Sequence, residues 1–354
     1  MKRKLRVLVL TNEHFLDSAS GQKDAIRILA QEDLIDSVEF VSHSLSRDGY
    51  KNYSAVASAL EENHFDILVI WSPRIFPETR DEFEEIIQKV NGRPIYYWEG
   101  DPWTSTGIKS WTEQMKWWAL ESQLIFTVAK EPHITMFRSA SDAKIVFIPQ
   151  TYCHVQFRKA ELTQPLSLSE SKSVVMIGSQ TARIPFVYGT PGSGMRFLAG
   201  ISLKLRFGHD FQLFGNKWPR GFSAGKVEYA QQANLIREFS MSANWDNFIH
   251  HESYVSDRLP IALLAGRVHI TSSHPGKNYY GSEDIGLFQV KGLFDLHQKI
   301  DELRAFDPVK LSSMGLEAHK WARNRFSHRE AARFMFSKIT NDIPSPQSEP
   351  WRDL

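Results

Sequence analysis

The sequence predicts an α/β protein built from two Rossmann-like, doubly wound domains that face a cleft. Its 354 residues are too many for one ordinary core and suit two domains of typical size. Short apolar runs alternate with longer amphipathic segments, as in βαβ units around a buried parallel sheet. This rhythm stops once, from about Thr151 to Lys172, and then starts again, which indicates two sheets in tandem.

Short apolar runs in the first part of the chain predict the strands of the first sheet. The segments between them fit helices, as from Asp81 to Val90, where Phe83, Ile86 and Ile87 recur at helical spacing. The predicted strands are residues 5–11, 37–42, 65–71, 94–100, 124–130 and 144–150.

A polar segment without periodicity, KAELTQPLSLSESK, ends this part and is typical of a connection between domains. We therefore expect a first domain of residues 1–155, a linker of 156–172, a second domain of 173–325, and a C-terminal helix and tail of 326–354 that pack back on the first domain. Further strands are predicted at 173–179, 210–215, 239–244, 267–273 and 285–290, and helices at 293–303, 309–326 and 329–339.

Composition excludes several classes of protein. The 42 basic residues nearly balance the 41 acidic ones, so net charge gives no preference for nucleic acid or an anionic membrane. No apolar stretch approaches the roughly 18 to 20 residues that a membrane helix needs, and no cleavage site follows the basic start MKRKLRVLVL. The single cysteine, Cys153, excludes an internal disulfide framework. We expect a soluble, cytoplasmic protein.

A glycine-rich segment, GTPGSGMR, follows the strand that ends at Gly178 and Ser179. Ligands of doubly wound sheets bind beyond the carboxyl ends of the strands. The amides at the start of the next helix attract anions, and Arg196 adds a full charge there, so a pyrophosphate could bind. The spacing matches neither a dinucleotide fingerprint nor a Walker loop. The alternative is a flexible loop with a solvated Arg196.

A second segment, from Ser256 to Gly276, has the pattern helix, glycine turn, strand and polar loop. Ser256 or Asp257 can cap this helix, and Gly266 ends it. Arg258 at the helix start would point to the same edge of the sheet as Arg196. The alternative for Arg258 is a surface ion pair.

Two carboxylates, Glu99 and Asp101, lie at the carboxyl end of the predicted strand at 94–100. Asp101 is the first candidate for a general base toward an acceptor hydroxyl, and Glu99 is the second. An Asp-Pro turn that caps the following helix is the alternative. Trp103 and the tryptophans near it could stack on a sugar or a base.

The thirteen histidines form no metal-binding pattern. His250 and His251 are adjacent, and His269 and His274 lack partnering carboxylates at ligand spacing. We predict no bound metal and no cofactor.

Taken together, these residues resemble glycosyltransferases of the GT-B fold, especially the spore-maturation-type group with a family-one-like C-terminal domain. A more distant likeness is to phage DNA β-glucosyltransferases, which share an IYY-type strand ending in an aspartate, here Asp101, that acts as the catalytic base. The phage enzymes also share the strand motif LFGN at 213–216. The motifs that match the spore-maturation-type group are VVMIGS with Gly194, Met195 and Arg196, then FQLFGNKW at 211–218, SAN at 242–244, Ser256 with Arg258 and Gly266, and NRFSHREAARFMF at 324–336.

The resemblance implies metal-independent transfer of a hexose or pentose from a nucleotide-diphosphate sugar, such as a UDP-sugar, to a hydroxyl acceptor. The first domain would bind the acceptor and the second the donor. Asp101 would be catalytic. Donor-binding positions are Gly178, Ser179, Arg196, Gly215, Asn216, Asn244, Ser256, Asp257 and Arg258; acceptor-binding positions are Glu99, Trp103, His14 and Gly21.

One departure concerns the donor ribose, and two rival functions remain. Related enzymes carry a ribose-binding glutamate where this chain has Ile261, so Ser256, Asp257 or Glu283 would take that role, or donor binding is altered. The rivals are a DNA-modifying glucosyltransferase acting on a hydroxymethylated base and a non-catalytic sugar- or nucleotide-binding protein. The stretch 181–193 is a second departure and could form a lid or an acceptor contact.

Overall fold

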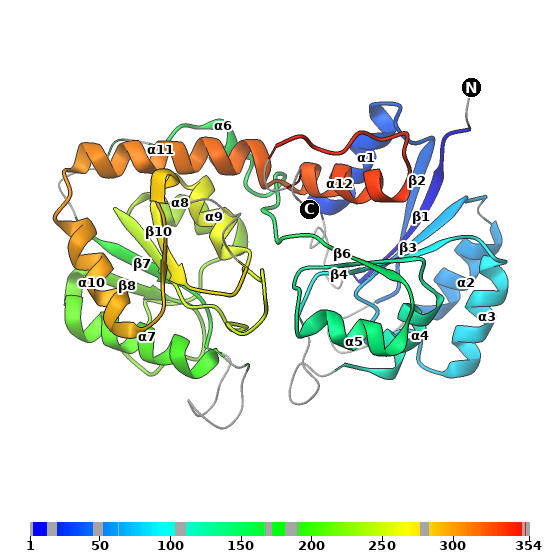
Figure 1. Ribbon diagram of the computed structural model, residues 1–354, viewed down its shortest axis with the longest axis horizontal. Helices are drawn as coiled ribbons and strands as arrows, with labels where there is room; N and C mark the ends of the chain where they lie inside the picture. The colour runs from blue at the N-terminus through cyan, green and yellow to red at the C-terminus, as the bar shows by residue number, and fades with distance from the viewer. Residues whose placement is uncertain are drawn as a thin grey trace. The chain divides into compact units, whose positions relative to one another are not determined.

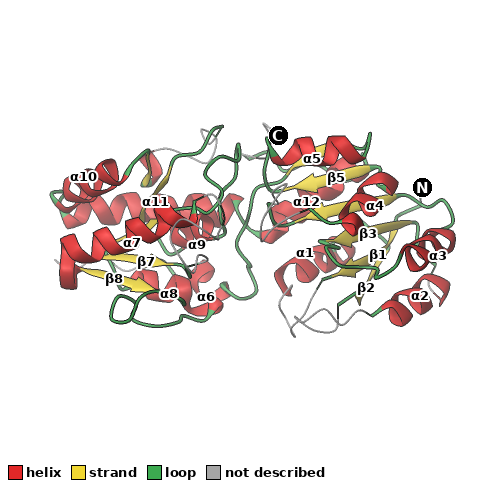
Figure 2. Cartoon of the chain, turned by 90° about the horizontal axis from the view of Figure 1, so that it is seen from below, coloured by secondary structure: helices red, strands yellow, loops and turns green. Residues whose placement is uncertain are grey.

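The computed structural model consists of two compact units, Met1–Pro149 with His328–Leu354, and Gln150–Ser327. Each is a parallel sheet with helices packed on it (Figures 1 and 2), so the predicted two-domain, Rossmann-like α/β fold is confirmed. The structure describes residues 3–12, 20–44, 52–62, 64–102, 111–165, 167, 172–180, 190, 192–276, 283–348 and 351.

The first unit contains a six-stranded sheet in the order β2-β1-β3-β4-β5-β6. Its strands are β1 (Arg6–Thr11), β2 (Ser37–Ser42), β3 (Ile67–Trp71), β4 (Ile95–Glu99), β5 (Leu124–Thr127) and β6 (Lys144–Phe147), each within a predicted run. Its helices are α1 (Ser20–Gln31), α2 (Tyr53–Glu62), α3 (Arg80–Val90), α4 (Glu113–Glu121), α5 (His133–Ala140) and α12 (His328–Ile339).

Both faces of this sheet are buried, which explains why its central strands are continuous apolar runs. Val7 and Val9 of β1 belong to one core cluster, while the alternate residues Leu8 and Leu10 belong to another. Because successive strand residues point to opposite faces, each strand contributes to two cores.

The C-terminal helix α12 belongs to this first unit. It packs on α1, and Phe334 and Phe336 share a core cluster with Ile26 and Leu29. The predicted helices of the last part of the chain are α10, α11 and α12. Helix α12, near the end of the chain, thus shares a core cluster of the first unit with β1 and α1, near its beginning.

The second unit contains a five-stranded sheet in the order β11-β10-β9-β7-β8. The predicted linker, 156–172, contains helix α6 (Arg158–Leu162), because apolar residues such as Phe157 and Ala160 recur at helical spacing and are buried. The strands are β7 (Val174–Ile177), β8 (Phe211–Phe214), β9 (Met241–Asn244), β10 (Val268–Ser272) and β11 (Leu287–Val290). The helices include α6 (Arg158–Leu162), α7 (Ser193–Phe207), α8 (Gln232–Arg237), α9 (Arg258–Leu264), α10 (Leu293–Arg304) and α11 (Pro308–Arg325).

In the described part of the chain, no helix is both long enough and apolar enough to cross a bilayer.

Candidate functional site

Two arginines meet at the carboxyl end of β7 in the second unit. Arg196 comes from the first turn of α7 and Arg258 from the first residue of α9. A Cβ on Gly178, just after β7, would lie 3.3 Å from Arg258 Nε and 3.9 Å from Arg196 Nη1. Parallel strands end at one edge of a sheet, so two arginines that are far apart in sequence converge on one glycine.

Arg196 is a buried cation, with only 2% of its surface exposed. Its Nε donates to the Trp245 carbonyl oxygen at 2.6 Å, and no carboxylate of the described residues forms an ion pair with it. Burial, and then the neighbouring Arg258, lowers its pKa to about 9. A solvated Arg196 is thereby excluded, and a bound anion could supply the counter-ion that the described residues do not provide.

Arg258 is less deeply buried, and its side chain is 28% exposed. Its Nε donates to the Ile177 carbonyl oxygen at 2.9 Å. Its Nη1 lies 3.8 Å from Asp257 Oδ1, which is a loose ion pair. The backbone contact therefore holds the guanidinium at the end of β7, while Asp257 compensates only part of its charge.

The turn after β8 packs directly on this strand end. Gly215 has a φ of 131°, and a Cβ there would lie 2.3 Å from the Gly178 carbonyl oxygen, so only glycine fits. The backbone N–H of Asn216 donates to Ser179 Oγ at 3.1 Å. The Asn216 side chain is exposed. These predicted donor positions line the ends of β7 and β8.

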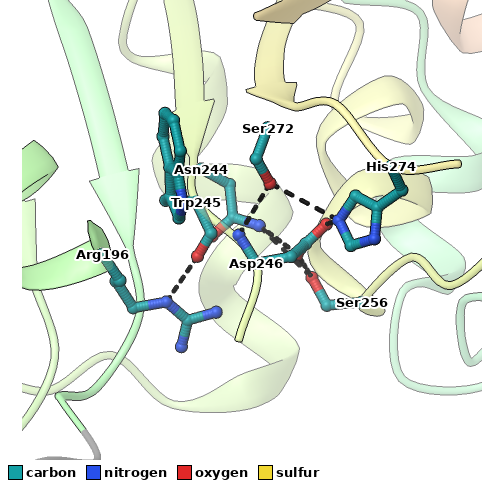
Figure 3. Close-up of polar contacts among 7 residues, drawn as sticks. All are labelled: Arg196, Asn244, Trp245, Asp246, Ser256, Ser272 and His274. Atoms are coloured by element: carbon teal, nitrogen blue, oxygen red, sulfur yellow. Dashed lines mark hydrogen bonds and ion pairs between the residues drawn. The ribbon is translucent and has the colours of Figure 1, made fainter. Parts of the chain in front are cut away.

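A buried polar network lies beside Arg196, at the ends of β9 and β10 (Figure 3). Asp246 Oδ1 accepts hydrogen bonds from Asn244 Nδ2 at 2.6 Å and from Ser256 Oγ at 2.7 Å. Asp246 Oδ2 lies 3.0 Å from His274 Nε2. His274 has no carboxylate at ligand spacing in the sequence, but the fold gives it a carboxylate partner from the neighbouring strand end, 28 residues away.

Asp246 is a member of this buried network that the sequence reasoning missed. The available signal was a carboxylate two residues after the asparagine that ends β9. Among the described residues, no three His, Cys, Asp or Glu side chains gather as a metal site.

Ile261 is fully buried one turn inside α9. Of the three residues considered for the ribose, Ser256 donates to Asp246. Glu283 lies in a short 3₁₀ turn, Glu283–Ile285, that precedes β11 and packs on α11, at the amino edge of the parallel sheet. Asp257 is the remaining one, at the same edge as Arg258.

In the first unit, Asp101 follows β4 and is exposed, whereas Glu99 is fully buried. Glu99 accepts hydrogen bonds from Ser72 Oγ at 2.9 Å, Tyr97 OH at 2.7 Å and the Asp101 backbone N–H at 3.1 Å. Burial and the Glu99 charge raise the pKa of Tyr97 well above its usual value. Of the two carboxylates, Asp101 is the one that a substrate could reach.

The remaining acceptor positions are only partly described. Gly21 is buried in the first turn of α1. His14 and Trp103 lie outside the described residues, as do residues 181–189 and 191 of the stretch 181–193.

No known protein-family model matches this chain, and no curated protein is significantly similar in sequence. Solved structures do match. A glycosyltransferase from Rickettsia africae ESF-5 has a TM-score of 0.60 at 14% identity, over 98% of this chain and 100% of that one. HepE from Anabaena, solved with UDP and glucose, has a TM-score of 0.58 at 13% identity, over 95% and 99%.

TarM has a TM-score of 0.54 at 13% identity, over 84% of this chain, which spans 59% of the length of TarM. At these identities the matches show the fold. The chain thus has the two-domain fold of GT-B glycosyltransferases.

Proposed function

We propose that this protein transfers a hexose or pentose from a nucleotide-diphosphate sugar, such as a UDP-sugar, to a hydroxyl acceptor, in the cytoplasm and without a bound metal. The observation that carries the proposal is the pair Arg196 and Arg258 beside Gly178, with Arg196 buried and lacking a described counter-ion. The solved complex of HepE with UDP and glucose supports it by analogy of fold.

The two arginines would stabilise the diphosphate as it leaves the sugar. Negative charge grows on the leaving group in the transition state, and fixed cations in a water-poor site stabilise it without reorganisation. With a pKa of about 9, Arg196 remains protonated at neutral pH. Gly178, which has no side chain, allows the phosphates to approach both guanidinium groups.

Asp101 would accept the proton of the acceptor hydroxyl if the reaction inverts the anomeric centre. Its carboxylate is exposed after β4, and its backbone N–H is held by the buried Glu99. The first domain would then bind the acceptor and the second the donor, as in the spore-maturation-type group that the sequence resembles.

The first experiment is a thermal-shift screen of the purified protein against nucleoside diphosphates and nucleotide sugars. A ligand that binds only the folded protein raises the free energy of unfolding, by about 2.7 kcal/mol at a ligand concentration of 100 times Kd, and so raises the melting temperature. We expect a shift with one nucleoside diphosphate and its loss in Arg196→Met. No shift with any of them would contradict the proposal.

A non-catalytic binding protein is the second candidate, and the buried Ile261 is the observation that favours it. This candidate would be supported if the protein binds a nucleotide sugar but neither hydrolyses it, even slowly, nor transfers its sugar to any tested acceptor.

A further inference from the structure

The loop after β9, residues 244–247, is in close contact with the start of α7, which carries Arg196. The Trp245 carbonyl oxygen accepts the hydrogen bond from Arg196 Nε. Gly192 precedes α7, and a Cβ there would lie 2.1 Å from the Asp246 carbonyl oxygen. The position of this loop therefore determines the position of the Arg196 guanidinium.

The loop is held in turn by Asp246, which is 1% exposed. Its carboxylate contacts Asn244, Ser256 and His274, and its backbone N–H donates to Ser272 Oγ at 3.1 Å (Figure 3). These contacts tie together the end of β9, the residue two before α9, and the loop after β10. Asp246 is thus the point where three chain segments are fixed next to Arg196.

A negative charge next to an anion site opposes anion binding, so the charge of Asp246 is not a reason for its position there. Burial and Arg258 lower the pKa of Arg196, whereas the Asp246 charge raises it, so the carboxylate acts on the guanidinium through space. Coulomb's law predicts that removing this charge strengthens anion binding. Loss of the hydrogen bonds would weaken binding, because the guanidinium would no longer be held. The two possible roles therefore predict opposite signs.

We propose that Asp246 is a positioning residue, which fixes the loop at 244–247 so that the Trp245 carbonyl holds Arg196 in its anion-binding orientation. The proposal depends on the proposed function only for the ligand, a nucleoside diphosphate.

The first test uses the ligand-free protein and measures hydrogen exchange of Arg196 Nε–H by NMR, with the resonance assigned through Arg196→Lys. We expect slow exchange in the wild type and in Asp246→Asn, whose amide can accept from Asn244 and Ser256. Asp246→Ala should exchange at least about tenfold faster. Unchanged exchange in Asp246→Ala would overturn the proposal.

The control is His319→Ala. His319 is 2% exposed and its Nδ1 lies 2.7 Å from the Leu264 carbonyl oxygen, at the far end of α9. This variant loses a buried hydrogen bond of the same unit without touching the loop, so Arg196 Nε–H should stay protected. If it exchanges as fast as in Asp246→Ala, general destabilisation explains both results and the proposal fails.

The second test measures the binding of UDP and of inorganic pyrophosphate by calorimetry. Asp246→Ala should bind about tenfold more weakly than the wild type, and Asp246→Asn equally well or more tightly. Tighter binding by Asp246→Ala would show that Asp246 acts as a counter-charge only, and would overturn the proposal.

Ser272→Ala serves if Asp246→Ala does not fold. It removes the hydroxyl that accepts from the Asp246 backbone N–H and that lies 3.5 Å from His274 Nε2, while the Asp246 carboxylate stays in place. It should give the same changes in smaller size, and unchanged exchange would contradict the proposal. A wild type that binds neither probe would contradict the proposed function, while the exchange measurement would still decide the role of Asp246.

Discussion

The two sheets carry buried charges of opposite sign at or just beyond the carboxyl ends of their strands, and the fold provides more hydrogen-bond partners for one charge than for the other. Glu99, in the first unit, receives hydrogen bonds from two hydroxyl groups and a backbone N–H. Arg196, in the second, gives one hydrogen bond to a carbonyl oxygen and has no described counter-ion. A charge that the fold satisfies has a structural role, whereas a buried charge that the fold leaves uncompensated indicates a ligand.

The largest effect is expected at the exposed carboxylate beside Glu99. Asp101→Asn removes the base that would accept the acceptor proton, and should lower the transfer rate by about 10²- to 10⁴-fold. Nucleoside diphosphate binding, measured by thermal shift, should not change. Asp142→Asn, an exposed aspartate of the same unit, is the control. An unchanged rate in Asp101→Asn would show that the base lies elsewhere.

Arg196→Met should weaken nucleoside diphosphate binding by about a hundredfold, since a charge-assisted hydrogen bond to phosphate contributes about 2–3 kcal/mol. The ligand-free variant should melt no lower than the wild type, because the substitution removes a buried cation that forms no ion pair with a described residue. Calorimetry and thermal denaturation of one sample measure both. A large loss of stability would mean that Arg196 is structural.

Glu99→Ala tests the same comparison, between Glu99 and Arg196, in the first unit. It leaves Ser72 Oγ and Tyr97 OH without their carboxylate, so the free energy of unfolding of the first unit should fall by about 2–3 kcal/mol. The pKa of Tyr97 should also fall, since two of the three causes that raise it, the Glu99 charge and the Glu99 hydrogen bond, are removed. Urea unfolding and ultraviolet titration measure these changes. Unchanged stability would remove the contrast between Glu99 and Arg196.

The smallest expected effect comes from a matched pair of glycines, each just after a strand. Gly178→Ala places a Cβ 3.3 Å from Arg258 Nε, and should weaken nucleoside diphosphate binding about threefold to fivefold by displacing the guanidinium. Gly100→Ala places its Cβ 3.9 Å from Ser72 Oγ, an ordinary contact, and should leave that binding unchanged. Equal effects in calorimetry would contradict a local role for Gly178.

The fold was predictable because buried parallel strands are continuous apolar runs, and each predicted run contains one observed strand. The meeting of Arg196 and Arg258 was predictable for a related reason, since the loops that follow parallel strands lie at one edge. The short helix α6 was not, because the Pro- and Ser-rich stretch after it concealed the apolar spacing of Phe157 and Ala160.

The sequence by itself determined the two sheets, the strand ends that carry charge, and the glycines that let backbones approach, because periodicity and residue type act locally. Only the tertiary structure decided which charges are compensated. His274 and Asp246 are 28 residues apart, and Glu99 is satisfied by a hydroxyl from another strand end. Whether a buried charge has a partner depends on contacts between distant segments, so packing decides that Glu99 is held by hydrogen bonds within the fold and that Arg196 forms no ion pair with a described residue.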